Sequence, residues 1–154
     1  FYLATAQAFD DEMRERIAKH QIDRDAEWTT FDTPIDLVAT LQHCDGPRHF
    51  ILIDCLTLWL SNLMLSELDW EAELEKLILA LGALRADVAL VSNEVGMGVV
   101  PDNALARAFR DAQGITNQSV AEIAECVVLM TAGLPLSLKG ELPERRKTPR
   151  GSRR

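Results

Sequence analysis

The chain has 154 residues, 47% of them hydrophobic, and a formal net charge of -8 at pH 7. This length suits one domain with a sizeable core, and the acidity argues against a nucleic-acid-binding protein, because such proteins gather Lys and Arg on the surface that meets phosphates. The longest apolar runs are shorter than a membrane span, so no transmembrane helix is expected.

Four apolar runs predict β-strands, at residues 1–6, 50–54, 86–92 and 127–131. The segments between these runs have the three- and four-residue spacing of apolar side chains that is typical of helices. Strands that alternate with helices pair in parallel, because each helix returns the chain to the same end of the sheet. The sequence therefore predicts an α/β fold with a parallel sheet flanked by helices.

Helical segments are expected at 12–19, from Pro34 onward, at 70–84 and at 103–125. Asp10 and Asp11 can cap the first of them. In the third, apolar residues fall on one side and acidic residues on the other, which is the pattern of a helix that covers a core. The last is expected to be interrupted at Gly114, since glycine is a poor helix former.

Polar residues follow two of the predicted strands at the point where each strand ends. Asp54 closes the second strand, and Asn93 and Glu94 follow the third. Gly96 and Gly98 come next and would let the backbone turn or approach a ligand closely. Because the carboxyl ends of parallel strands lie at one edge of the sheet, the two acids are expected to share one site.

The cysteines Cys44, Cys55 and Cys126 are odd in number and far apart, so we expect reduced thiols rather than disulfides. Reduced thiols indicate the cytoplasm. Residues 140–154 are rich in Arg, Pro and Gly. They are expected to form a basic, disordered tail, because they cannot bury enough apolar surface to fold alone.

Several longer motifs occur between residues 1 and 139. They are Tyr2-Leu-Ala-Thr-Ala6, Arg16-Ile-Ala-Lys-His20, Asp54-Cys-Leu-Thr-Leu-Trp-Leu-Ser-Asn62, Ser92-Asn-Glu-Val-Gly-Met-Gly-Val-Val-Pro101 and Asn117-Gln118. Together they resemble the bifunctional adenosylcobinamide kinase and adenosylcobinamide-phosphate guanylyltransferase family of cobalamin biosynthesis. The resemblance implies a P-loop nucleotide-binding fold related to the RecA core, in which a parallel sheet lies between two layers of helices.

The resemblance also implies two reactions at one nucleotide site. In the first, ATP or GTP phosphorylates the aminopropanol hydroxyl of adenosylcobinamide. In the second, GMP passes from GTP to a histidine and then to adenosylcobinamide phosphate, which gives adenosylcobinamide-GDP. By its place in Arg-Ile-x-x-His, the histidine that accepts GMP falls on His20. The alternative is that His20 is a solvated residue that faces the negative end of a helix dipole.

The two acids at the strand ends have two interpretations each. In P-loop enzymes a carboxylate at the position of Asp54 holds Mg²⁺ near the β- and γ-phosphates, whereas the alternative is an N-cap for a helix from Leu56 onward. Glu94 would orient the cobinamide hydroxyl or a metal-bound water. Its alternative is a loop carboxylate that accepts hydrogen bonds from backbone N–H groups.

The resemblance places further nucleotide contacts after the first strand, after His20 and at Asp32. They are Ala4, Thr5, Ala6, Gln21, Ile22, Asp23, Arg24 and Asp32. Arg24 can bind phosphate through two N–H groups, or it can form a weak surface ion pair with a neighbouring aspartate. The family also suggests a homotrimer.

One family element, the phosphate-binding sequence G-x-x-x-x-G-K-[ST], does not occur in the chain. We therefore expect residues 1–139 to be an N-terminally truncated P-loop domain that lacks its first strand, P-loop and first helix. Such a domain is expected to show weak or no kinase activity by itself, because phosphoryl transfer depends on the electrostatic stabilisation that the loop supplies. The alternative function is a non-catalytic remnant that serves as an interaction module.

Overall fold

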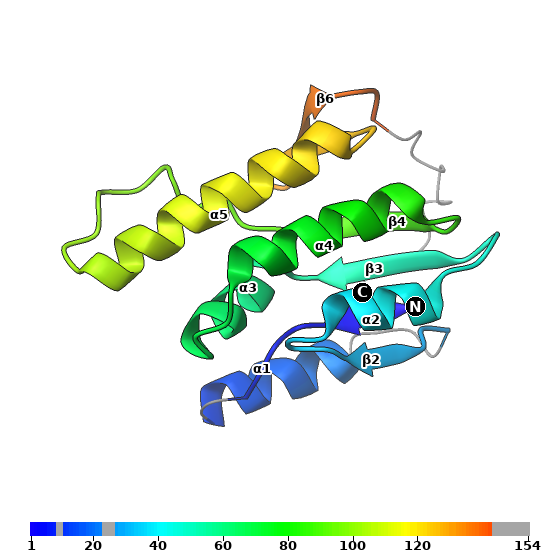
Figure 1. Ribbon diagram of the computed structural model, residues 1–154, viewed down its shortest axis with the longest axis horizontal. Helices are drawn as coiled ribbons and strands as arrows, with labels where there is room; N and C mark the ends of the chain where they lie inside the picture. The colour runs from blue at the N-terminus through cyan, green and yellow to red at the C-terminus, as the bar shows by residue number, and fades with distance from the viewer. Residues whose placement is uncertain (9–10, 23–26, 143–154) are drawn as a thin grey trace, which may run out of the picture. The chain divides into compact units, whose positions relative to one another are not determined.

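The computed structural model describes residues 1–8, 11–22 and 27–142. The chain divides into two compact units, Phe1–Val120 and Ala121–Arg154. The first unit contains a four-stranded parallel sheet with the strand order β2-β1-β3-β4 (Figure 1). Its strands are β1 (Tyr2–Ala4), β2 (Thr30–Asp32), β3 (Phe50–Asp54) and β4 (Asp87–Val91).

Helices connect these strands, as the alternating pattern predicts. They are α1 (Asp11–Ile22), α2 (Leu37–Cys44), α3 (Leu56–Leu65), α4 (Trp70–Ala83) and α5 (Ala104–Ile123). The predicted α/β fold, with a parallel sheet flanked by helices, is confirmed. No helix in the part of the chain that the structure describes is long and apolar enough to cross a membrane.

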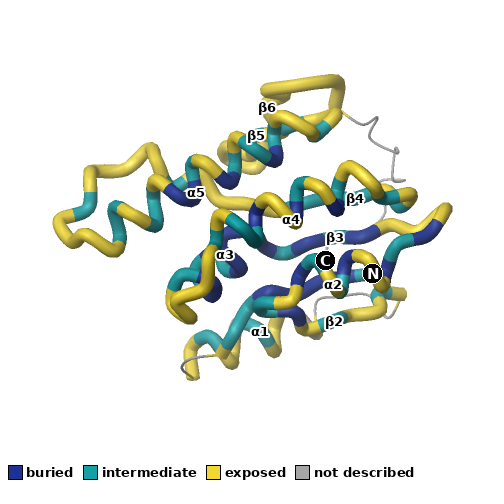
Figure 2. The backbone as a smooth tube through the Cα atoms, in the orientation of Figure 1, coloured by how far each residue is buried: buried dark blue, intermediate teal, exposed yellow. Residues whose placement is uncertain are grey.

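The core of the first unit forms where the central strands meet the helices. β1 is buried along its whole length, and Ile51 and Ile53 of β3 are fully buried (Figure 2). They pack in one cluster with apolar side chains of α2, α3 and α4, among them Leu41, Trp59 and Leu77. Trp59 also donates a hydrogen bond from its indole N–H to the carbonyl of Ile35 at 3.0 Å. A buried indole N–H usually needs such a partner.

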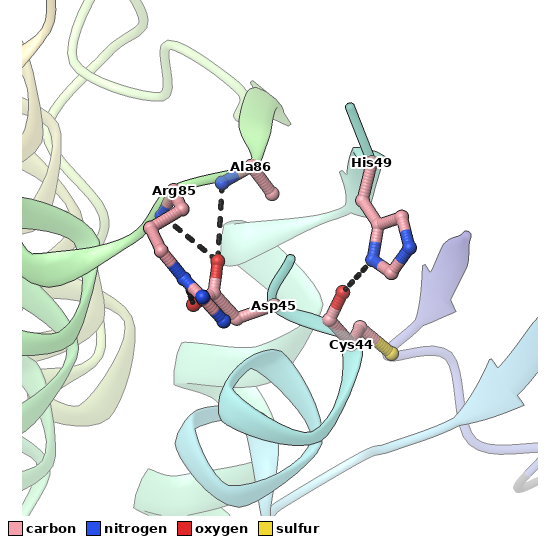
Figure 3. A network of polar contacts seen from close by, with 5 residues as sticks. All are labelled: Cys44, Asp45, His49, Arg85 and Ala86. Carbon is pink, nitrogen blue, oxygen red and sulfur yellow. Dashed lines mark hydrogen bonds and ion pairs between the residues drawn. The ribbon is translucent and has the colours of Figure 1, made fainter. Parts of the chain in front are cut away.

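The amino ends of β3 and β4 are joined by a polar network around Asp45 (Figure 3). One carboxylate oxygen accepts from the backbone N–H groups of Arg85 and Ala86 at 2.8 and 3.1 Å, and the other accepts from the Arg85 guanidinium at 3.1 Å. Close by, Nδ1 of His49 bonds to the carbonyl of Cys44 at 3.0 Å. The turn after α2 is thereby tied to the segment that enters β4.

Two details of the first unit differ from the predictions. β2 was not predicted, because it has only three residues and two of them are exposed, so that it lacks a clear apolar pattern. α5 continues through Gly114, so the predicted interruption there is wrong. The cost of about 1 kcal/mol for a glycine inside a helix is offset by burial of the face that holds Ala112, Thr116 and Val120.

The second unit contains a two-stranded sheet of its own. The strand predicted at 127–131 forms as β5 (Val127–Thr131), but it pairs antiparallel with β6 (Leu134–Lys139) and is not part of the parallel sheet. Ala132 and Gly133 connect the two strands with φ values of 52° and 73°. A two-residue hairpin turn of type I′ has positive φ at both positions, and this turn was not predicted from the sequence. The predicted tail lies outside the described residues from 143 onward.

Candidate active site

Six of the predicted site residues lie at the carboxyl edge of the parallel sheet. The register places Asp32, Ala4, Asp54 and Val91 opposite one another on successive strands. Thr5 and Ala6 follow directly after β1, and Glu94 comes three residues after the end of β4. The structure therefore brings together six of the predicted residues, Ala4, Thr5, Ala6, Asp32, Asp54 and Glu94, at one edge.

Thr5 fastens the end of β1 to the end of β3. Its hydroxyl donates to the carbonyl of Cys55 at 2.7 Å and accepts from the N–H of Cys55 at 2.8 Å, while its own N–H donates to the carbonyl of Asp54 at 3.1 Å. The peptide bond between Asp54 and Cys55 is cis. Thr5 is fully buried, and its carbonyl accepts from the amide of Asn62 on α3 at 2.8 Å. The Thr5 side chain therefore fixes the shape of the site.

The carboxylate of Asp54 accepts a hydrogen bond from the hydroxyl of Tyr2. The N-cap residue of α3 is Cys55, and this cap makes no side-chain hydrogen bond. The alternative interpretation of Asp54 as the N-cap of this helix is thus wrong. Within the described ranges Asp54 forms no ion pair and belongs to no group of three or more His, Cys, Asp or Glu residues that could hold a metal. A single carboxylate suits Mg²⁺, which keeps several waters and takes its other ligands from phosphates.

Glu94 lies in the exposed loop after β4. Its Oε1 accepts a hydrogen bond from the backbone N–H of Gly96 at 2.7 Å. This bond agrees with the alternative interpretation of Glu94 as a loop carboxylate bonded to the backbone, and its catalytic role stays a prediction. A Cβ atom at position 96 would lie 2.8 Å from the same oxygen, so a larger residue there would displace the Glu94 carboxylate from this position.

A network of neutral side chains surrounds the start of this loop. The amide of Asn117 accepts from the hydroxyl of Ser92 at 2.6 Å and from the amide of Gln113 at 2.8 Å, and it donates to the carbonyl of Asn93 at 3.1 Å. The N–H of Asn93 donates to the hydroxyl of Thr57 at 2.8 Å. The sequence predictions did not include this network. The motifs named above contain all of its members except Gln113, but they do not show that these residues contact one another.

His20 lies in the last turn of α1 and is exposed. It is nine residues from the start of this helix at Asp11, which corresponds to roughly 13 Å along the helix axis. The imidazole makes no hydrogen bond or ion pair with another residue among those described, so no such contact links it to the edge with the acids. Ile22 is 82% exposed, Gln21 lies on the same helix, and the predicted residues Asp23 and Arg24 lie outside the described ranges.

Comparisons with known proteins find one family model and relatives that agree with it. Residues 1–138 match the family model described as cobinamide kinase / cobinamide phosphate guanyltransferase. The bifunctional adenosylcobalamin biosynthesis protein CobP of Pseudomonas aeruginosa is 46% identical over 142 residues, which cover 91% of this chain and 82% of that protein. The bifunctional adenosylcobalamin biosynthesis protein CobU of Escherichia coli is 36% identical over 153 residues, with coverage of 90% and 84%. The protein of the same description from Salmonella typhimurium is 37% identical over 153 residues, with the same coverage.

Proposed function

The chain belongs to the cobinamide kinase / cobinamide phosphate guanyltransferase family and has the two activities of that family in adenosylcobalamin biosynthesis, and we propose that two separate groups of residues perform them. Asp54 and Glu94, at the carboxyl edge of the sheet, serve phosphorylation. His20, on α1, serves transfer of GMP. The arrangement of two acids on one edge and one histidine on a separate helix is the observation that supports this division.

In the kinase reaction, the aminopropanol hydroxyl of adenosylcobinamide attacks the γ-phosphorus of ATP or GTP. The bond from that phosphorus to the bridging oxygen breaks, the nucleoside diphosphate leaves, and the hydroxyl proton passes to the carboxylate of Glu94. Asp54 would hold Mg²⁺, which supplies positive charge to the β- and γ-phosphates. Ala4, Thr5, Ala6 and Asp32 border the nucleotide, with Thr5 acting through the shape that it gives the backbone.

In the guanylyltransferase reaction, a ring nitrogen of His20 attacks the α-phosphorus of GTP. A nitrogen–phosphorus bond forms and pyrophosphate leaves. A phosphate oxygen of adenosylcobinamide phosphate then attacks the same phosphorus, the nitrogen–phosphorus bond breaks, and adenosylcobinamide-GDP is released. Gln21, Ile22, Asp23 and Arg24 follow His20 along the chain and contact the nucleotide, and the guanidinium of Arg24 neutralises phosphate charge.

We further propose a homotrimer in the cytoplasm. The three free cysteines support a reducing compartment. Sedimentation velocity on the protein, expressed at the full length that its gene encodes, measures the assembly state, and a monomer or dimer at micromolar concentration would contradict the trimer.

Incubation of the protein, expressed at the full length that its gene encodes, with α-labelled GTP tests the role of His20. We expect an acid-labile label on the unmodified protein and on a His43→Ala control, and none on His20→Ala, because only His20 accepts GMP. His43 is an exposed histidine that contacts the ring of Phe31 and lies outside the site. A label of normal intensity on His20→Ala would show that another group accepts GMP. Glu94→Gln in the same assay should keep its label while it loses phosphorylation of adenosylcobinamide.

A further inference from the structure

Both backbone polar groups of Asn93 are bonded to side chains of helices. Its N–H donates to the hydroxyl of Thr57 at 2.8 Å, and its carbonyl accepts from the amide of Asn117 at 3.1 Å. Thr57 belongs to α3 and Asn117 to α5. The peptide units on the two sides of Asn93 are therefore fixed by two different helices, and the backbone enters Glu94 from a defined position.

The amide of Asn117 is itself held in one orientation. Its oxygen accepts from Ser92 at 2.6 Å and from Gln113 at 2.8 Å, and the Gln113 amide also donates to the Ser92 hydroxyl at 3.0 Å. These three contacts form a closed set, in which each side chain bonds to the other two. With its oxygen occupied by two donors, the Asn117 amide directs its nitrogen at the carbonyl of Asn93.

Gln113 is fully buried, and its Oε1 has no hydrogen-bond partner among the described residues. An unsatisfied buried acceptor is unfavourable, and the two hydrogen bonds that the Gln113 nitrogen donates offset this cost. The amide is useful here for its nitrogen, which bonds to both Ser92 and Asn117. This arrangement favours a role in orienting the loop over a role in stability alone.

We propose that Thr57, Gln113 and Asn117 are positioning residues for Glu94 in the kinase reaction. The inference rests on the proposed role of Glu94 as the group that takes the hydroxyl proton. A general base has to lie within hydrogen-bond reach of that proton, and a displacement of about 1 Å can cost about 100-fold in rate. Thr57 lies three residues after Asp54, so its bond to Asn93 also sets the separation of the two acids.

The test uses the protein expressed at the full length that its gene encodes, and it combines each positioning variant with Glu94→Gln. We expect Thr57→Val and Asn117→Ala each to lower kcat for phosphorylation of adenosylcobinamide by about tenfold, with the KM for nucleotide unchanged. In the Glu94→Gln background the same changes should cause no further loss, because the group that they position is already absent. Thr57→Ser keeps the hydroxyl and should restore the rate. Labelling by α-labelled GTP should be unchanged throughout.

Thr40→Val is the matched control, because among the residues that the structure describes the Thr40 hydroxyl bonds to the carbonyl of Asp36 and the hydroxyl of Thr33, away from this loop. It should keep full kinase activity. If Thr57→Val fails to fold by circular dichroism, Asn117→Ala decides the question, since Asn117 is only half-buried.

Three results would contradict the inference, and they can be told apart. Equal losses from Asn117→Ala with and without Glu94, or an equal fall in GMP labelling, would show that the network supports the whole site and not Glu94. An undiminished kinase rate in both positioning variants would show that the loop needs no such support. Normal phosphorylation by Glu94→Gln alone would remove the proposed role of Glu94, and the inference with it.

Discussion

The acidic residues at the two edges of the parallel sheet differ in their contacts. At the amino edge, Asp45 accepts hydrogen bonds from two backbone N–H groups and forms an ion pair with Arg85 at 3.1 Å (Figure 3). At the carboxyl edge, Asp54 accepts from the neutral hydroxyl of Tyr2, and Glu94 accepts from one loop N–H. Neither of these two acids forms an ion pair with any residue that the structure describes.

This difference separates an acid that holds the fold together from acids that are available for chemistry. The charge of Asp45 is already neutralised within the protein. The charges of Asp54 and Glu94 are held in place by neutral groups, so they can still attract a cation or take a proton. The contacts of each acid thus distinguish the structural role of Asp45 from the roles proposed for Asp54 and Glu94.

The largest effect on activity is expected from Asp54→Asn, and Asp45→Asn is the variant compared with it. The first should lower kcat for phosphorylation of adenosylcobinamide by about 100-fold or more, because it removes the charge that would hold the metal at the phosphates. The second should change kcat by less than about twofold and lower the melting temperature, because its contacts belong to the fold. Steady-state kinetics and thermal unfolding of both variants measure this. Similar losses of activity in the two would show that the edges do not differ in function.

The carboxyl edge could be predicted from the sequence because its residues end apolar runs. Asp54 and Glu94 each follow a strand that is visible as a run of apolar residues, and parallel pairing brings such ends together. The supporting contacts could not be predicted in this way. Thr57, Asn93 and Asn117 lie far apart in the chain, and only the packing of α3 and α5 brings them within hydrogen-bond distance.

The strands with weak apolar patterns could not be predicted from the sequence either. β2 is short and mostly exposed, and β6 consists mainly of exposed residues, so tertiary pairing decides both. His20 was identified from its motif alone, since an exposed histidine at the end of a helix has no distinguishing pattern. Its role therefore depends on chemistry that only labelling can reveal.

A smaller effect is expected from Tyr2→Phe, which tests whether a neutral partner matters at the carboxyl edge. The change removes the hydroxyl that donates to Asp54 and keeps the ring, which contacts Trp28 edge to face. We expect kcat for phosphorylation to fall about three- to tenfold, since Asp54 is less well oriented but keeps its charge. Trp28→Leu serves as the control for loss of the ring contact, and it also removes the contact of Trp28 with Phe50. An unchanged kcat in Tyr2→Phe would mean that Asp54 does not need this partner.

The acid stability of the protein should depend on the amino edge. The Arg85 backbone N–H, which donates to Asp45, lowers the pKa of that carboxyl, and the Arg85 side chain and the Ala86 N–H add to the effect. Because the folded-state pKa lies below the unfolded value of about 3.9, Asp45 stabilises the fold above that pH and loses this contribution as the pH falls through its lower folded-state pKa. Urea unfolding should show a difference between the unmodified protein and Asp45→Asn that is largest near neutral pH and shrinks in acid. A difference that grows in acid would reverse the sign of this linkage.

The smallest effect is expected in the rates at which two buried cysteines are modified. Cys44 lies beside the amino edge and Cys55 beside the carboxyl edge. Burial raises the pKa of both thiols, and the charge of Asp54 raises that of Cys55 further, so iodoacetamide should modify both more slowly than the exposed Cys126. Nucleotide at a concentration near its Kd should slow the modification of Cys55 about twofold, because binding suppresses local opening of the edge that it occupies. Cys44 should react at the same rate with and without nucleotide. Peptide mass spectrometry measures all three rates, and equal protection of Cys44 and Cys55 would mean that nucleotide binding stabilises both edges alike.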